Sequence, residues 1–271
     1  MANALINGID VYYEVSGDGP PLLFINGSGS TIDDVRPLTA LFAPAFRVAI
    51  ADSRGMGRTS VPEAAYAMAD LASDAVGLAD RLGWAAFNLI GVSFGGMVAQ
   101  EVAVTVPARI QRLVLVCTSS GGAGGSSYPL QDLAQLEPGQ RAAQSARIMD
   151  TRFTPEWLAA HPEEQALLDR LARQRSEEPS ASAQRGAELQ LQARAGHDVF
   201  DRLSRIKSPT LVASGRFDGI APPENGAQIA AQISGAELRL YEGGHGFFLQ
   251  DPTAIPEVMD FLRSGSAAEH V

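Results

Sequence analysis

The sequence has only one cysteine, Cys117, among its 271 residues, so it cannot form an internal disulfide bond. A chain of this length buries enough apolar surface to fold without disulfide bonds or a structural metal. Cys117 follows the apolar run Leu-Val-Leu-Val at 113–116, which is typical of a small filler in a buried strand rather than of a reactive thiol. The scarcity of cysteine fits a reducing compartment.

Positive charge and long apolar runs are also scarce. The chain has 21 Lys and Arg against 31 Asp and Glu, a net charge of −10, whereas nucleic acids and anionic lipid surfaces require a basic footprint. No apolar run approaches the roughly 20 residues that cross a bilayer, and the first ten residues do not resemble a secretory signal peptide. We therefore expect a soluble, cytoplasmic protein that acts on a small molecule, with a homo-oligomer left open.

Patterns for metal and dinucleotide binding are missing as well. There is no H-E-x-x-H, no cysteine cluster, and the four histidines lie far apart in the sequence, so we expect neither a metal nor a cofactor. The glycines at 91, 95 and 96 do not fit G-x-G-x-x-G, which argues against a dinucleotide-dependent oxidoreductase.

What the sequence does contain is a repeated alternation of short apolar runs with longer amphipathic segments. The predicted strands are Ile9–Ser16, Leu22–Asn26, Val48–Asp52, Phe87–Val92, Leu113–Thr118, Thr210–Ser214 and Glu237–Tyr241. Several are almost continuously apolar, as in a parallel sheet covered on both faces. The predicted helices between them include Met68–Leu82, Phe94–Val106, Pro222–Ile233 and Thr253–Leu262. This alternation indicates an α/β fold with a mainly parallel sheet flanked by helices.

The alternation stops between residues 121 and 196. A stretch of glycine and serine over 119–127 is followed by a segment rich in Ala, Gln, Glu, Leu and Arg, which favours helix and contains no strand-like run. We predict a helical lid over 121–196, inserted into a core domain made of residues 1–120 and 197–271.

The most specific chemical motif is Gly91-Val-Ser-Phe-Gly95, which matches G-x-S-x-G. It follows a predicted strand and opens a predicted helix, which is the context of a nucleophile elbow. Such a sharp turn pushes the serine oxygen clear of the sheet, and the flanking glycines remove side chains that would collide across the turn. The motif predicts Ser93 as a nucleophile.

A serine hydroxyl is a poor nucleophile until a base takes its proton. His245 lies between a predicted strand and the last predicted helix, where a doubly wound sheet places its site chemistry. Asp218 follows the strand over 210–214 and would orient the imidazole. The chain order Ser93, Asp218, His245 is one in which a Ser-His-Asp triad occurs.

Acyl transfer also needs two donors aimed at the oxyanion. The predicted donors are the backbone N–H of Phe94 and, by position in the loop Asn26-Gly-Ser-Gly29, the N–H of Ser28. Candidate substrate-pocket residues are Asn26, Met97, Arg152 and Trp157. Arg152 would clamp a substrate carboxylate. Packing explains Met97 equally well, and the alternative for Trp157 is that it holds the lid helices on the main domain.

With these motifs, the chain resembles the α/β-hydrolase superfamily from its first strand to its last helix. The segment Asp52-Ser-Arg-Gly-Met-Gly-Arg-Thr-Ser60 is similar to the family's structural D-x-R-G-x-G-x-S loop. Asn26-Gly27 stands where the family usually has His-Gly; this asparagine and the segments 121–129 and 152–162 resemble the bacterial 3-oxoadipate enol-lactonase group. The resemblance implies an eight-stranded, mainly parallel sheet with a helical lid after the sixth strand.

The residues and the resemblance together predict a serine hydrolase that cleaves a carboxylic ester or lactone through an acyl-enzyme. A carbon–carbon bond hydrolase, a thioesterase or a cofactor-free perhydrolase of the same fold remains open, because the fold alone does not select among them. Ser93 argues against haloalkane dehalogenase and epoxide hydrolase chemistry, which use an aspartate at the elbow. From another class, a ligand receptor that reuses the fold is the alternative.

Overall fold

The computed structural model describes residues 2–174 and 180–264 and contains an eight-stranded sheet with strand order β1-β2-β4-β3-β5-β6-β7-β8. Its strands are β1 (Ala2–Ile6), β2 (Ile9–Ser16), β3 (Pro21–Ile25), β4 (Arg47–Ala51), β5 (Phe87–Val92), β6 (Ile110–Val116), β7 (Thr210–Gly215) and β8 (Glu237–Tyr241). β1 and β2 pair antiparallel, as do β2 and β4, and all other neighbours are parallel. The predicted mainly parallel sheet of eight strands is confirmed.

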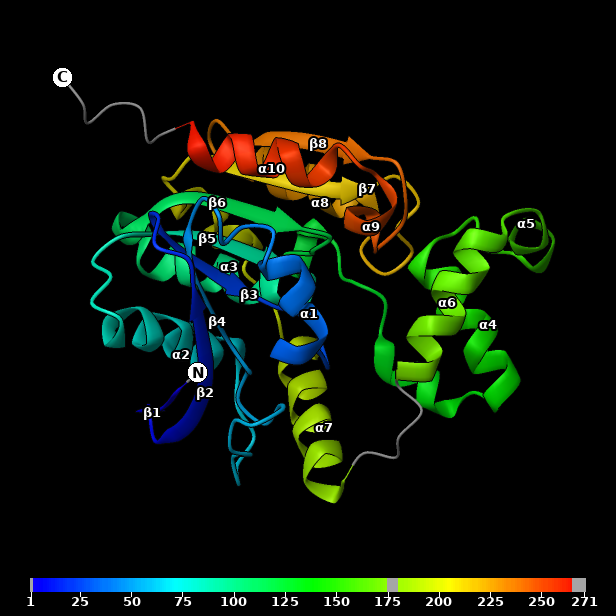
Figure 1. The fold of residues 1–271 in the computed structure, drawn as a ribbon, viewed down its shortest axis with the longest axis horizontal. Helices are drawn as coiled ribbons and strands as arrows, with labels where there is room; N and C mark the ends of the chain where they lie inside the picture. Colours follow the sequence, from blue (N-terminus) through cyan, green and yellow to red (C-terminus); the bar gives the residue numbers. More distant parts are fainter. Residues whose placement is uncertain (1, 175–179, 265–271) are drawn as a thin grey trace.

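Helices cover both faces of this sheet (Figure 1). They are α1 (Ile32–Thr39), α2 (Met68–Arg81), α3 (Phe94–Thr105), α8 (Pro223–Gln232), α9 (Phe247–Gln250) and α10 (Ala254–Arg263). One hydrophobic cluster joins the sheet to α2, α3 and α8, and a second joins it to α1 and α10. In β3, Leu23 and Ile25 enter the first cluster, whereas Leu22 and Phe24 enter the second. Two-sided burial therefore explains the continuous apolar runs.

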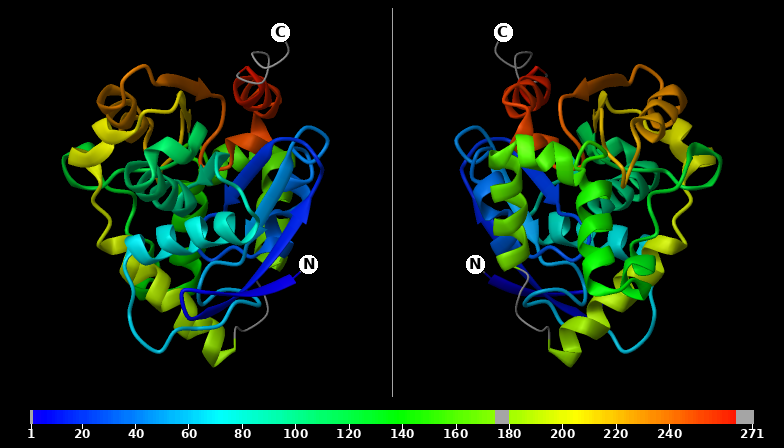
Figure 2. Two further views of the ribbon diagram at one scale, coloured as in Figure 1. Left: turned by 90° about the vertical axis from the view of Figure 1, so that its left-hand side faces the viewer. Right: turned by 90° about the vertical axis from the view of Figure 1, so that its right-hand side faces the viewer.

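The first strand and the first helix were not predicted from the sequence. β1 and β2 form a hairpin at the sheet edge opposite β8 (Figure 2), joined by Asn7-Gly8, whose φ angles of 49° and 77° suit a tight hairpin turn. Helix α1 contains Pro37, which obscures its helical pattern. The side chain of Asp34 accepts from the backbone N–H of Thr31 at 2.7 Å and so caps its first turn.

The connection between β6 and β7, the sixth and seventh strands, contains helices and 3-10 turns and no strand among its described residues. It contains 3-10 turns (Gly122–Gly124 and Leu130–Gln135) and helices α4 (Pro138–Met149), α5 (Pro155–Ala160), α6 (Pro162–Gln174) and α7 (Ala181–Ala195). Proline occupies the first turn of α4, α5 and α6, where its missing N–H costs no hydrogen bond. In Figure 1 these three helices lie beyond the carboxyl ends of the parallel strands.

Helix α7 instead packs against the main body of the protein. Leu189 is fully buried, and Gly186 lies so close to Gly55 that a Cβ at 186 would collide with the Gly55 carbonyl. The division into a lid over 121–196 and a core stays a prediction, and residues 1 and 265–271 of the predicted core lie outside the described residues. No helix in the described part of the chain is both long and apolar enough to cross a membrane.

Candidate active site

Ser93 occupies a sharp turn between β5 and α3. Its φ and ψ of 56° and −117° are rare for a residue with a side chain. A Cβ at Gly91 would collide with the carbonyl of Gly95, and a Cβ at Gly95 would collide with the carbonyl of Ile25. Both positions therefore require glycine, and the structure has the strand–turn–helix geometry that the motif predicted.

The structure brings Ser93, His245 and Asp218 together, although 152 residues separate the first two in sequence. The Nε2 atom of His245 lies 2.9 Å from the Oγ atom of Ser93, and its Nδ1 atom lies 2.8 Å from the Oδ2 atom of Asp218. The other Asp218 oxygen accepts from the backbone N–H groups of Ile220 and Ala221, each at 2.8 Å. The Asp218 side chain has no exposed surface and that of His245 is 12% exposed, so water cannot compete for the carboxylate.

The end of α4 holds the loops that carry the acid and the histidine. The backbone N–H of His245 donates to the carbonyl of Met149 at 2.6 Å. The N–H of Gly219, next to Asp218, donates to the carbonyl of Ile148 at 3.0 Å, and the N–H of Thr151 donates to the carbonyl of Phe217 at 2.8 Å. One short stretch of the insertion is therefore bonded to both loops.

The buried carboxylate of Asp150 extends this support. It is 1% exposed and accepts from the guanidinium of Arg152 at 2.6 and 2.9 Å and from the Nε2 atom of Gln250 at 3.0 Å. The Oε1 atom of Gln250 in turn accepts from the N–H of Gly244 at 2.9 Å, directly before His245. The sequence analysis found neither Asp150 nor Gln250, because 100 residues separate them.

Replacing Asp150 by alanine should lower the free energy of unfolding by about 3 kcal/mol, because it leaves Arg152 and Gln250 without their shared acceptor. We also expect kcat to fall about 10- to 100-fold at a temperature where the variant is fully folded, since small displacements of reacting groups are costly. Urea unfolding and steady-state kinetics measure the two effects. Glu156→Gln, which alters an exposed carboxylate of the same segment, is the matched control, and an unchanged kcat in Asp150→Ala would contradict a positioning role.

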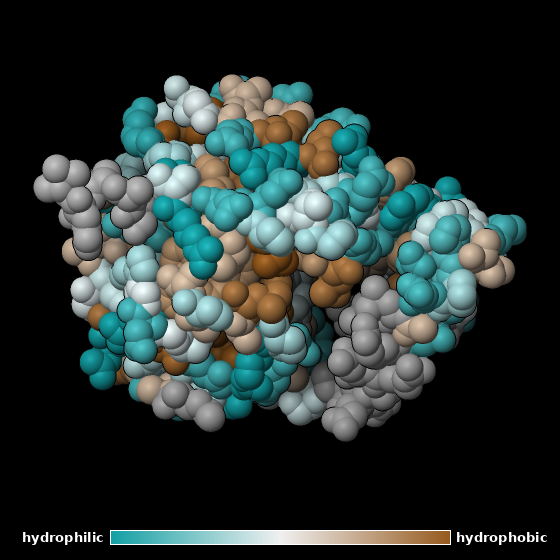
Figure 3. All heavy atoms as spheres, turned by 45° about the horizontal axis from the view of Figure 1, so that its top comes forward, coloured by the Kyte–Doolittle hydropathy of each residue, from teal (hydrophilic) through white to brown (hydrophobic). Residues whose placement is uncertain are grey.

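A cleft of about 500 Å³ opens in front of Ser93 and His245. Its apolar walls come from α1, the 3-10 turn over 130–135 and α4, through Val35, Leu38, Leu130, Leu133, Ile148 and Met149. Figure 3 shows a hollow between the main body and the helical insertion, with hydrophobic side chains gathered beside it. The cleft therefore suits a small, largely apolar molecule.

The loop over 26–29 lines this cleft beside Ser93. Its backbone approaches so closely that a Cβ at Gly27 would lie 3.6 Å from the Cβ of Ser93. The Nδ2 atom of Asn26 donates to the carbonyl of Ser30 at 2.9 Å, and the Oε1 atom of Gln190, on α7, accepts from the N–H of Gly29 at 2.7 Å. The structure thus places Asn26 and Ser28 at the cleft, and sequence reasoning missed the support from Gln190.

Three predicted pocket residues do not line this cleft. Arg152 is bound to Asp150 and lies over the ring of Phe217, 4.1 Å from its centroid, so it is not available to a substrate carboxylate there. Trp157 stacks on His161, with ring centroids 3.7 Å apart. Met97 is buried in the hydrophobic cluster below the sheet. Met97 packs in this cluster and also lines a second cavity, described below, and Trp157 packs against Phe153 and His161 of the same insertion.

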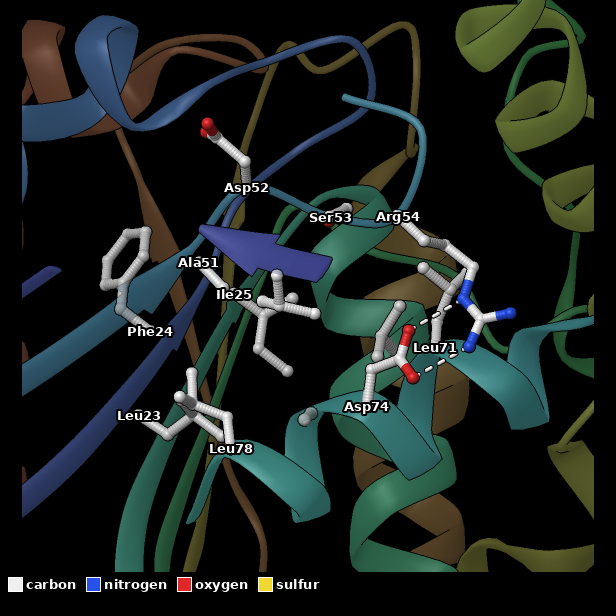
Figure 4. A pocket seen from close by; sticks show the side chains of 13 residues that line it. Leu23, Phe24, Ile25, Ala51, Asp52, Ser53, Arg54, Leu71, Asp74 and Leu78 are labelled. Carbon is white, nitrogen blue, oxygen red and sulfur yellow. Dashed lines mark hydrogen bonds and ion pairs between the residues drawn. The ribbon is translucent and has the colours of Figure 1, made fainter. Parts of the chain in front are cut away.

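The loop over 52–60 lies away from the cleft and joins elements of the fold. The carboxylate of Asp52 accepts from the N–H of Ile32, at the start of α1, at 2.7 Å. Arg54 pairs with Asp74 of α2 at 2.6 and 2.7 Å beside a small cavity of about 40 Å³, from which Asp52 points away (Figure 4). These contacts agree with the structural role that the resemblance implied.

Cys117 also lies near the triad residues. Its Sγ atom, the Asp218 carboxylate and a His245 ring nitrogen fall within 4.8 Å of one another. Burial and the nearby Asp218 carboxylate raise the pKa of the Cys117 thiol, and its S–H donates to the His245 carbonyl at 3.2 Å. The protonated thiol is a poor metal ligand, and Asp218 and His245 are hydrogen-bonded to each other.

The other described histidines, His161 and His197, lie outside the group formed by Ser93, His245 and Asp218. His161 bonds through Nδ1 to the carbonyl of Trp157 at 2.7 Å. His197 is buried where the insertion returns to the core, and this burial lowers its pKa to about 4, with the Glu101 carboxylate opposing the shift only in part. His270 lies outside the described residues.

His197 should make the protein less stable in acid. The unfolded chain binds this proton near pH 6.5 and the folded chain only near pH 4, so the free energy of unfolding falls as the pH is lowered between these values. Since one pKa unit corresponds to about 1.36 kcal/mol, the loss approaches about 3 kcal/mol. Urea unfolding across this pH range should show that the free energy of unfolding depends less steeply on pH in His197→Gln than in the wild type. An identical pH dependence in the two proteins would contradict the lowered pKa of His197.

The sequence matches the family profile for the alpha/beta hydrolase fold over residues 20–252. The chain belongs to the α/β-hydrolase fold family. Poly(3-hydroxyalkanoate) depolymerase of Ectopseudomonas oleovorans is 30% identical over 248 residues, which cover 90% of this chain and 84% of that protein. 3-Oxoadipate enol-lactonase 2 of Acinetobacter baylyi is 28% identical over 244 residues, covering 90% and 88%.

Among solved structures, this α/β-hydrolase is similar to the enol-lactonase from Burkholderia xenovorans LB400. The TM-score is 0.79 at 23% identity, with 97% of this chain and 100% of the other covered. The family and the hydrolase assignment predicted from the sequence are thereby confirmed, as is the resemblance to the enol-lactonase group.

Proposed function

We propose that this α/β-hydrolase cleaves a carboxylic ester or lactone of a small molecule, with Ser93 as nucleophile, His245 as general base and acid, and Asp218 as the group that orients His245. The observation that carries the proposal is that the two nitrogens of one imidazole lie 2.9 Å from the Ser93 hydroxyl and 2.8 Å from the Asp218 carboxylate. This arrangement is that of a hydroxyl activated by an oriented base.

The reaction begins when the Oγ atom of Ser93 attacks the substrate carbonyl while the Nε2 atom of His245 takes the hydroxyl proton. Asp218 fixes the tautomer by accepting from Nδ1 and stabilises the imidazolium. The backbone N–H groups of Phe94 and Ser28 bind the oxyanion of the tetrahedral intermediate. The imidazolium then protonates the leaving alcohol, and the acyl group stays on Ser93.

Hydrolysis of the acyl-enzyme repeats these steps with water as the nucleophile. His245 removes a proton from the water, the acyl–oxygen bond to Ser93 breaks, and Ser93 regains its proton. In a lactone the leaving alcohol and the acyl group belong to one molecule, so the product is a hydroxy acid. The apolar walls of the 500 Å³ cleft favour a substrate with a small hydrocarbon portion.

The relatives support an ester-type bond as the target. One relative is named a poly(3-hydroxyalkanoate) depolymerase and another a 3-oxoadipate enol-lactonase, and each covers about nine-tenths of this chain. The loop over 26–29 lines the cleft and carries Asn26, one of the residues in which the chain resembles the enol-lactonase group.

The test is the hydrolysis of p-nitrophenyl acetate and butyrate and of a panel of γ- and δ-lactones, with mass spectrometry of the protein during turnover. We expect a burst of p-nitrophenol and an acyl adduct on the peptide that contains Ser93. The ratio of lactone to ester turnover then defines the subclass. Thioesters and a dienoic ketone are tested alongside, because they are substrates of the alternative reactions. The proposal would be contradicted if no ester or lactone were turned over and no acyl adduct formed on Ser93.

A further inference from the structure

A second cavity of about 160 Å³ lies where the helical insertion joins the core, and it shares no lining residue with the Ser93 cleft. The outgoing connection contributes Ser119, Ser126 and Ser127, and the returning connection contributes Arg194 and His197. The two connections are bonded to each other, because the N–H of Val199 donates to the carbonyl of Ser120 at 2.9 Å. Polar side chains of both connections thus face one cavity.

The cation of this cavity has no carboxylate partner among the described residues. Arg194 is 7% exposed, and within residues 2–174 and 180–264 it donates only to neutral oxygens, the Oγ atom of Ser127 at 2.7 Å and the carbonyl of Tyr128 at 2.8 Å. The nearby Glu101 is bound to Arg202 at 2.6 and 2.8 Å. A buried charge is costly unless it is paired, so the site is suited to an anion.

The imidazole of His197 supplies the second polar contact. It is 7% exposed, and neither ring nitrogen makes a hydrogen bond of good geometry within the described ranges, although the Ser119 backbone lies close enough to favour the protonated ring. A neutral imidazole offers one N–H donor and one acceptor nitrogen. Buried polar groups of folded proteins are almost always hydrogen-bonded, so an incompletely bonded imidazole beside a buried cation indicates a ligand that carries a hydrogen-bonding group in addition to its anionic group.

We propose that this cavity binds a small carboxylate that also carries a hydroxyl group, with the carboxylate on Arg194 and the hydroxyl on His197. The ligand has at most about six non-hydrogen atoms, because a cavity of about 150 Å³ holds one benzene molecule. Ser126 and Ser127 lie at the same cavity and can complete its hydrogen bonds. A bound ligand would bridge both connections of the insertion.

The experiment is titration of the ¹⁵N-labelled protein with L-lactate, propionate and propionamide, followed at the arginine Nε–Hε signal that disappears in Arg194→Gln. Lactate should shift this signal and bind more tightly than propionate, and propionamide should bind at least about 10-fold more weakly, because a hydrogen bond to a charged group is worth more than a neutral one. Calorimetry gives the three affinities independently.

Variants locate the binding. Arg194→Gln should weaken lactate binding at least about 10-fold. Ser126→Phe, which places a large side chain at the exposed rim of the cavity and keeps the cation, should also weaken binding even if Arg194→Gln does not fold. Arg185→Gln, an exposed arginine of the same helix, should bind lactate like the wild type. No binding of either carboxylate, or unchanged binding in Ser126→Phe, would overturn the proposal.

This inference is independent of the proposed hydrolase function. Ser93→Ala should keep lactate binding while losing ester hydrolysis, and Arg194→Gln should show the opposite pattern. A protein that hydrolyses esters but does not bind lactate would refute only the second site. A protein that binds lactate without hydrolysing any ester would refute only the catalytic proposal.

Discussion

Ser93→Ala is expected to lower kcat for ester hydrolysis by about 10⁴- to 10⁶-fold. The three residues of a triad act together, so His245 and Asp218 contribute little once the nucleophile is gone. Most of the loss appears in kcat, because the apolar walls that bind the substrate are untouched; KM rises only by the factor that acyl-enzyme accumulation lowers it in the wild type. Steady-state kinetics with p-nitrophenyl butyrate measure both constants. The residual rate should reflect binding and the backbone donors alone.

Ser145→Ala is the matched control for this variant. Ser145 also lines the cleft, but it stands on α4, whereas the His245 Nε2 atom is bonded to the Ser93 hydroxyl. Its replacement should change kcat by less than about 10-fold, because it removes no group that is strengthened in the transition state. If Ser93→Ala kept more than a small fraction of the wild-type rate while Ser145→Ala lost activity, Ser93 would not be the nucleophile.

The elbow was predictable because its constraints are local. One short segment contains the serine that adopts positive φ and the two glycines within five positions that the turn requires. The same segment joins a strand to a helix, as the motif demands. The sheet was predictable for a similar reason, because two-sided burial makes β3 and the stretch 113–116 of β6 continuously apolar. Ser93, His245 and Asp218 could be proposed as partners because a serine reaction needs those three chemical types at strand ends.

The support of the site could not be predicted, because it depends on contacts between distant segments. Gln190 reaches the loop at Gly29 across 161 residues, and Gln250 reaches Asp150 across 100. Nothing in either glutamine's neighbours along the chain distinguishes it from an exposed amide. Arg152 was misplaced for the same reason, since only the fold brings Asp150 and Phe217 to it.

Asp218→Asn is expected to lower kcat by about 10⁴-fold, through the tautomer of His245 rather than through lost packing. In the native protein, the Oδ1 atom of Asp218 accepts from two backbone N–H groups, of Ile220 and Ala221. An asparagine must place its amide oxygen at that position, because its NH₂ group cannot accept a hydrogen bond. The NH₂ group is then forced to face the Nδ1 atom of His245.

A donor facing Nδ1 makes that nitrogen an acceptor and leaves the proton on Nε2, the atom that must receive the Ser93 proton. The ¹⁵N chemical shifts of the His245 ring should therefore report the Nδ1–H tautomer in the wild type and the Nε2–H tautomer in Asp218→Asn. Asp201→Asn, at an exposed aspartate, should change neither the shifts nor kcat. If Asp218→Asn kept the wild-type tautomer of His245 yet lost activity, Asp218 would act through its charge alone. If Asp218→Asn kept both the tautomer and the activity, the triad assignment would fail.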